Sequence, residues 1–406
     1  MAVESKRRIP FTIFLGSILL AFFVDVRAIN WALIYGGWVQ TDGLMNMLYP
    51  ITVAFVVIAI WGQYIQSGKM YVKPVTIFQT LYLLMFYWLT QSLIGQPYIT
   101  FLMFGVTTLC AFIIPQVLKV DVPTFLMATM AFPSFAIFRI DQVFVSTVDW
   151  DIILPMDTTY AFLVPVVANA VYVACYFKKE KSRINKILTL IFSIINMLFF
   201  LRMLMYGSRS PILCVFALLV WLYISNFKES TWHINRKRLS WILMTIFICL
   251  IVAIPLLTLV EQTLSSWGIE INALTKLLKL SAEGDLSNGR SGINAVTLAA
   301  IVERPFLGWG LDRFDANTGL QYPHNFILQT LYDGGALLFC ILFIPIITHL
   351  KKLIKHQTRN QFAYVTALFF SSVPGALFSQ DLWAIPALWV CFGAIVKPYI
   401  YTRIIK

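Results

Sequence analysis

Charged residues are scarce in this chain. They make up 12% of its 406 residues, whereas hydrophobic residues make up 59%. A soluble globular domain usually carries about 25% charged residues, so this composition excludes that class. Apolar runs of about 20 residues recur along the whole length, and each is long enough to cross a hydrocarbon core about 30 Å thick. Because the runs are continuous and not alternating, they predict membrane-spanning helices and exclude a β-barrel.

Cysteine is also rare, and its spacing excludes a metal-binding framework. All six cysteines fall inside apolar runs, so we interpret them as small core residues and expect no disulfides. Asp149 and Asp151 could hold a divalent ion beneath a diphosphate, but no third ligand lies nearby. We see no sign of a nucleotide-binding fold. The sequence therefore favours a site with no metal ion and no other cofactor.

Twelve apolar segments predict an all-α, polytopic membrane bundle that forms one integral membrane domain, residues 1–406. They are residues 9–25, 44–66, 74–94, 98–118, 122–140, 158–177, 187–205, 211–227, 241–260, 324–350, 361–378 and 382–400. An even number places both termini on one side. That side carries 22 of the 31 basic residues and only four of the 19 acidic ones, so we predict that it is cytoplasmic. The net charge of +12 then reflects topology and does not indicate a nucleic-acid partner.

Three connections on the predicted outer side are long: residues 26–43, 141–157 and 261–323. The last is the large extracytoplasmic loop of the predicted bundle. Within it, residues 264–280 have the apolar period of a helix on the membrane surface, and residues 283–289 form a polar break. Residues 293–302 predict a second helix, which Pro305 and a glycine turn would end.

His324 is the only histidine on the predicted outer side, and it lies at the mouth of a span, before Asn325. An imidazole there could act as a general base near neutral pH. The alternative is that His324 hydrogen-bonds the loop and anchors the helix at the membrane interface.

Two arginines, Arg209 and Arg290, each lie in a turn before a predicted helix start, and Arg202 lies about two helical turns before Arg209. A guanidinium group grips phosphate oxygens through a bidentate fork, and a helix N-terminus also favours an anion. With the histidine, these arginines predict a site for a phosphate-bearing lipid. The alternative is arginines that snorkel to the membrane interface. Arg304 and Arg313 lack the helix-start context, so we interpret them as loop structure.

Several short motifs follow one another in the second half of the chain. They are Gly207-Ser208-Arg209, Gly289-Arg290-Ser291, the segment from Glu303 to Gly310, Pro323-His324-Asn325 and Gly334-Gly335. Their order resembles the O-antigen polymerase/ligase superfamily, in particular the polymerases of polysaccharide repeat units. These are bacterial membrane glycosyltransferases that use polyprenyl-diphosphate sugars. The resemblance implies a GT-C-like bundle in the bacterial cytoplasmic (inner) membrane, with cytoplasmic termini and an extracytoplasmic active site.

The resemblance also implies roles for residues and partners. Arg209 and Arg290 would bind the diphosphate, and His324 would deprotonate the acceptor hydroxyl in an inverting displacement. Further expected substrate contacts are Arg202, Tyr322 and Asn325. The expected partners are polyprenyl-diphosphate-linked oligosaccharides as donor and acceptor, membrane lipid and a chain-length regulator protein.

Three functions fit this sequence. We expect a polymerase of glycan repeat units, for example of O-antigen or capsule type in polysaccharide or lipopolysaccharide biosynthesis. The first alternative is a ligase that transfers glycan to lipid A core or to a protein. The second is a flippase for lipid-linked oligosaccharides, but transporters usually carry charges or broken helices near the bilayer midplane. The predicted spans are nearly free of charge at that depth, which favours an enzyme.

Overall fold

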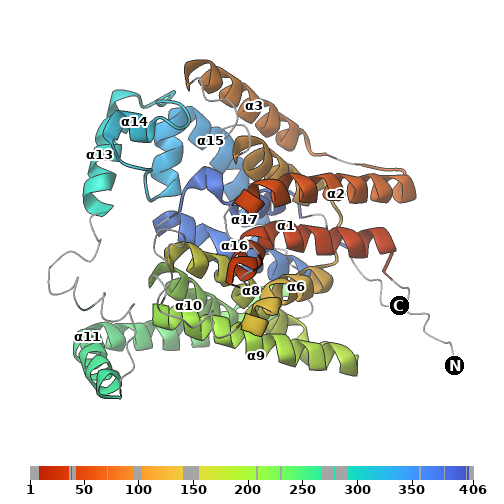
Figure 1. The fold of residues 1–406 in the computed structure, drawn as a ribbon, viewed down its shortest axis with the longest axis vertical. Coiled ribbons are helices and arrows are strands. Elements are labelled where there is room, and N and C mark those ends of the chain that lie inside the picture. The colour runs from red at the N-terminus through yellow and green to blue at the C-terminus, as the bar shows by residue number, and fades with distance from the viewer. Residues whose placement is uncertain are drawn as a thin grey trace.

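The computed structural model shows a bundle of helices (Figure 1). The structure describes residues 9–35, 38, 43–70, 72–94, 103–139, 155–206, 209–228, 231–267, 278, 290–355, 358–378, 380–398 and 400–401.

Each of the predicted apolar segments contains a helix. In chain order these are α1 (Phe11–Tyr35), α2 (Gly43–Ser67), α3 (Pro74–Ile94), the π-helix η1 (Met103–Cys110) continued by α5 (Ala111–Val117), α6 (Val122–Ala131) continued by the 3-10 helix η2 (Phe132–Arg139), α8 (Pro155–Cys175), α9 (Arg183–Tyr206), α10 (Arg209–Ile224), α11 (Arg236–Ser266), α15 (Phe326–Lys355), α16 (Arg359–Phe378) and α17 (Pro386–Val396). Within the described residues, five helices are long and apolar enough to cross a membrane, and six more are apolar but shorter. An all-α membrane bundle is therefore confirmed, whereas the number of crossings and the GT-C-like fold remain predictions.

Smaller elements connect these helices. They are η3 (Phe177–Lys179), the strands β1 (Ser225–Lys228) and β2 (Thr231–Ile234), α13 (Arg290–Glu303), α14 (Phe314–Thr318) and η4 (Leu382–Ala384). The two strands pair in an antiparallel hairpin, with Ser225 opposite Ile234, which the sequence did not predict. The helix predicted at residues 293–302 corresponds to α13, which begins three residues earlier and ends two residues before Pro305.

The first helix is longer than predicted, and this corrects the boundary of the first outer connection. We ended the span at the first charged residue, Asp25, but α1 continues to Tyr35 and its candidate span runs from Phe11 to Ile34. Asp25 and Arg27 therefore lie inside the helix. Asp25 is fully buried against other helices, so protein rather than lipid surrounds it. The prediction that the spans are nearly free of charge was wrong for α1.

Parts of two predicted outer connections lie outside the described residues. These parts are residues 140–154, with Asp149 and Asp151, and residues 268–277 and 279–289. The predicted surface helix is described only as far as Trp267, apart from the isolated residue 278, and the polar break at residues 283–289 is not covered. These predictions remain open.

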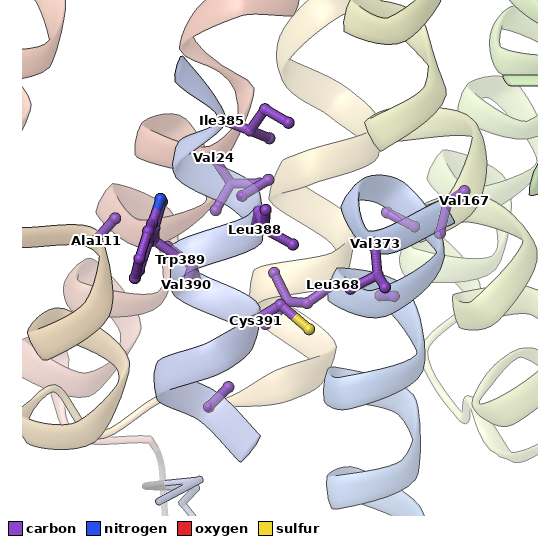
Figure 2. Close-up of a cluster of buried hydrophobic side chains, with 14 of the residues drawn as sticks. Val24, Ala111, Val167, Leu368, Val373, Ile385, Leu388, Trp389, Val390 and Cys391 are labelled. Carbon is purple, nitrogen blue, oxygen red and sulfur yellow. The ribbon is translucent and has the colours of Figure 1, made fainter. Parts of the chain in front are cut away.

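Helix α17 forms the centre of the bundle. All of its residues are buried, and it packs against α5, α15 and α16. Figure 2 shows Leu388 and Cys391 of α17 between Val24 of α1 and Leu368 of α16. A helix that is apolar on every side needs protein contacts all round, and α1, α5 and α16 supply them.

The outer helices of the bundle expose large apolar side chains. Trp61 of α2 is 64% exposed and Trp88 of α3 is 73% exposed, with many aliphatic neighbours. Such a surface suits hydrocarbon and not water. Among the described cysteines, Cys175, Cys214 and Cys391 are buried as predicted, but Cys340 is exposed because it lies on the outward face of α15.

Candidate active site

His324 lies directly before α15, in a segment that its neighbours hold in place. The ring of Tyr322 packs edge-on against its imidazole, with ring centroids 4.5 Å apart. Asn325 caps the helix, because its Oδ1 accepts hydrogen bonds from the backbone amides of Ile327 (2.9 Å) and Leu328 (3.3 Å). An N-cap of this kind defines where a helix begins. The half-buried His324 therefore lies at the helix entrance, where the sequence predicts it.

Helix α15 is interrupted at Gly334-Gly335. Gly335 has φ 62° and ψ −164°, so the hydrogen bonds of a continuous helix are not made there. Four backbone hydrogen bonds to residues 305–310, here named the docked loop, replace them. The pairs are Trp309 N to Tyr332 O (2.8 Å), Gly310 N to Asp333 O (2.8 Å), Ala336 N to Pro305 O (2.8 Å) and Leu337 N to Phe306 O (3.2 Å). Because unpaired backbone groups are strongly unfavourable in hydrocarbon, the docked loop is what makes this break possible.

Two glycines allow the docked loop to approach the helix this closely. A Cβ atom on Gly335 would lie 2.3 Å from the carbonyl carbon of Phe306. A Cβ atom on Gly308, which has φ +68°, would lie 2.5 Å from the carbonyl oxygen of Tyr332. Both contacts are with backbone atoms, which have little room to move. The sequence therefore needs glycine on each side of this contact.

Aromatic contacts hold the docked loop on α13 and α15. The indole of Trp309 stacks on the ring of Tyr332, with centroids 6.3 Å apart and planes at 15°. Its Nε1 donates to the carbonyl of Ala300 in α13, at 2.8 Å. The Arg304 guanidinium lies over the same indole, 4.0 Å from the ring centroid, as a cation–π contact. This geometry agrees with our interpretation of Arg304 as loop structure.

A buried polar network, which the sequence analysis missed, joins α15 to the segment before α17. Trp383 Nε1 donates to Asp333 Oδ2 (2.6 Å), and Gln329 Nε2 donates to Asp381 Oδ1 (2.7 Å). The amide of Trp383 also donates to Asp381 Oδ1, at 2.9 Å. Burial raises the pKa of Asp381, and the hydrogen bonds from Gln329 and Trp383 oppose that rise. Acidic residues inside or beside apolar spans are unusual, and this signal could have identified both aspartates.

The predicted arginines lie on three different helices. Arg290 is the first residue of α13, which packs against α15, so it belongs to an element next to the histidine. Arg209 is the first residue of α10, as the helix-start prediction requires. Arg202 lies in α9 and is 1% exposed, so an anion must enter the bundle to reach it. Figure 1 shows α9 and α10 on the opposite side of the bundle from α13 and α15. Arg290 thus begins a helix that packs against α15, the helix that follows His324, whereas the other two arginines lie on a separate pair of helices.

Within the part of the chain that the structure describes, no group of three His, Cys, Asp or Glu side chains could hold a metal ion. Asp149 and Asp151, the metal ligands that we considered from the sequence, lie outside that part.

A comparison with known protein families matches the segment that contains this site. Residues 194–343 match the family described as O-antigen ligase, and this range includes all six predicted site residues and the interrupted part of α15. No curated protein and no solved structure matches the chain significantly. The matched segment covers less than half of the chain, and the apolar helices within and outside it are those of a multi-pass membrane protein. Residues 194–343 are therefore similar to the O-antigen ligase family, in agreement with the resemblance that the sequence motifs carry.

Proposed function

We propose that this protein is a membrane glycosyltransferase that polymerises polyprenyl-diphosphate-linked oligosaccharide repeat units on the outer face of the cytoplasmic membrane. The observation that supports the proposal best is the position of His324 within the matched segment. It lies at the capped entrance of α15, beside a ring that packs on its imidazole, and α15 contacts the helix that begins with Arg290. A base at a helix entrance and a guanidinium at a neighbouring helix start are the groups that glycosyl transfer from a diphosphate needs.

In the proposed reaction, His324 takes the proton of an acceptor hydroxyl as its oxygen attacks the anomeric carbon of the donor sugar. A new glycosidic bond forms, the bond from that carbon to the diphosphate breaks, and polyprenyl diphosphate leaves from the opposite face. One displacement inverts the anomeric configuration. Arg290 holds the charge that grows on the diphosphate, which is the task that a metal ion performs in other enzymes. Arg209, which begins α10 on the other side of the bundle (Figure 1), is assigned no contact with this group.

A ligase is the second candidate, because the matched family is described as O-antigen ligase. A ligase needs the same donor site and base but a different acceptor, lipid A core or a protein. We favour the polymerase because the predicted outer loop spans residues 261–323 above an apolar, aromatic-rich bundle. That arrangement suits two lipid-linked substrates.

The test supplies purified enzyme with polyprenyl-diphosphate repeat units as the only substrate. We expect a ladder of lipid-linked products, each longer by one repeat. Transfer that occurs only after lipid A core or protein is added would identify a ligase. Movement of intact substrate across vesicles without a new glycosidic bond would identify a flippase. A chelator should leave the ladder unchanged, and loss of the ladder that Mg²⁺ reverses would contradict the metal-free mechanism.

Arginine variants test the donor site in the same assay. Arg290→Lys should strongly reduce the ladder, because lysine cannot form the bidentate contact. Arg304→Lys is the matched control, since a lysine can still lie over the Trp309 ring. Equal activity of the two variants would exclude Arg290 from the diphosphate site.

A further inference from the structure

A cavity lies at the end of the bundle where α15 and α17 begin, here named the His324 end. It is lined by residues of α1, α2, α8 and α16 and of the segment that leads into α17. None of these residues lies within the matched range 194–343, so the cavity belongs to parts of the chain that the family comparison does not cover. Figure 2 shows two of the lining residues, Val24 and Ile385, above Leu388 of the central core.

The polar groups of this cavity suit a ligand with hydroxyl groups. The polar residues among its lining are Arg27, Tyr49, Tyr160, Ser371 and Gln380. One cation among several neutral donors and acceptors is a poor match for a diphosphate but a good match for a sugar edge. The cavity volume of about 30 Å³ has room for about two water-sized groups, which means hydroxyls and not a whole sugar ring.

The cavity adjoins the segment that bears the candidate base. Gln380 lines it, and the next residue, Asp381, accepts the hydrogen bond from Gln329 at 2.7 Å. Gln329 follows His324 by little more than one helical turn of α15. A group bound in the cavity is therefore connected to the first turns of α15 through Gln380, Asp381 and Gln329.

Two further features indicate that this region is built for binding. Gly375 lets α16 pass close to the cavity, because a Cβ atom there would lie 2.7 Å from the Tyr160 ring and 3.0 Å from Gln380 Oε1. Asp25, next to the lining residue Val24, is fully buried, and neither of its carboxylate oxygens has a hydrogen-bond partner among the described residues. An ionisable group inside a membrane span is expensive to keep and usually marks a functional region.

We propose that this cavity binds the hydroxyl-bearing edge of one sugar residue of the acceptor glycan, with Arg27 and Gln380 as its main contacts. The proposal rests on the proposed glycosyl transfer, since it assigns the acceptor to the side of the base. The proposed sugar site also lies outside the matched segment, in the part of the chain that would recognise the particular glycan.

The test measures binding without turnover, in the His324→Ala background. The probe is the lipid-free repeat-unit oligosaccharide released from the polysaccharide of the host cell, titrated calorimetrically into purified protein. Arg27→Gln and Gln380→Ala should each weaken binding by about tenfold or more, as expected for a lost hydrogen bond to a ligand. Gly375→Ala should weaken it as well, because it displaces Tyr160 and Gln380. Arg304→Gln, which removes a cation outside the cavity, should bind like the parent protein.

The outcomes separate this proposal from the proposed function. Unchanged binding in folded Gln380→Ala and Gly375→Ala protein overturns the cavity assignment even if Arg27→Gln cannot be purified. A second outcome is that oligosaccharide binding depends on these residues but the protein with His324 intact forms no product. This outcome supports the cavity as a sugar site and contradicts the proposed polymerase activity. Thermal unfolding of each variant verifies that it is folded.

Discussion

The two halves of α15 differ in the side chains that they bury and expose. The first half, residues 326–333, buries the polar side chains Gln329, Thr330 and Asp333. The second half, residues 336–355, exposes the apolar side chains Leu337, Ile344, Ile347 and Ile354. The glycine pair between them breaks the helix and receives the docked loop. The first half thus places polar side chains inside the protein, whereas the second half packs Leu338 and Leu342 into the core and exposes apolar side chains on its other face.

The largest expected effect comes from the two histidines of this segment. His324 lies before the first half, and His349 lies in the second half, where its Nδ1 contacts the Pro345 carbonyl at 2.8 Å. Loss of a positioned base slows a reaction by about 10²–10⁴-fold, so we expect that loss in His324→Ala and a near-normal rate in His349→Ala. Single-turnover rates of the purified variants measure both. Similar rates for the two variants would show that His324 is not the base. They would also contradict a functional difference between the two halves of α15.

The second effect concerns the junction. Gly335→Ala places a Cβ against the Phe306 backbone and forces alanine into a conformation that only glycine adopts readily. We expect a loss of at least about 2–3 kcal/mol of stability, together with loss of activity. The control is Gly292→Ala in α13, where a Cβ would meet nothing within 4 Å. Because Gly292 lies in the first turn of α13, where alanine is at least as favourable for a helix as glycine, this variant should be no less stable than the parent. Thermal unfolding in detergent compares them, and a Gly335→Ala protein as stable as the parent would contradict the docked-loop geometry.

The smallest effect tests the buried network of the first half. Trp383→Phe removes the indole donor from Asp333 and leaves a buried carboxylate oxygen without that partner. The expected loss is about 1–3 kcal/mol. Trp88→Phe on the lipid-facing surface is the control, since Trp88 is 73% exposed. Combining Trp383→Phe with Asp333→Leu should recover part of the loss, because the unpaired acceptor is then gone. A double variant less stable than the sum of its parts would contradict this interpretation of the network.

Local patterns predicted those parts of the site that depend on neighbouring residues. The helix that follows Gly292, its end before Pro305 and the position of His324 ahead of a helix follow from cap and turn residues close in sequence, although α13 begins three residues earlier than predicted. The pairing of the docked loop with α15 and the hydrogen bond from Gln329 to Asp381 could not be predicted this way. They join residues that only the folded bundle brings together, and no periodicity encodes them.

The error in α1 has a different physical cause. Hydropathy treats a charged residue as the end of a span, because a charge facing lipid is unfavourable. Asp25 is surrounded by other helices, so that rule does not apply to it. A single sequence does not show which face of a helix packs against protein. For this reason neither the length of α1 nor the cavity could be predicted.

The docked loop also bears on how this protein is assembled. Its four hydrogen bonds close loops of moderate length within one stretch of the chain, from Pro305 to Leu337. The chain entropy lost on closing a loop rises only slowly with its length, so this contact can form without waiting for more distant segments. The loop is also synthesised before the helix that it breaks, so its free amides and carbonyls are already present when the second half of α15 enters the bilayer. Helix interruption and loop capture can then occur as one local event during insertion, independent of the late arrival of α16 and α17.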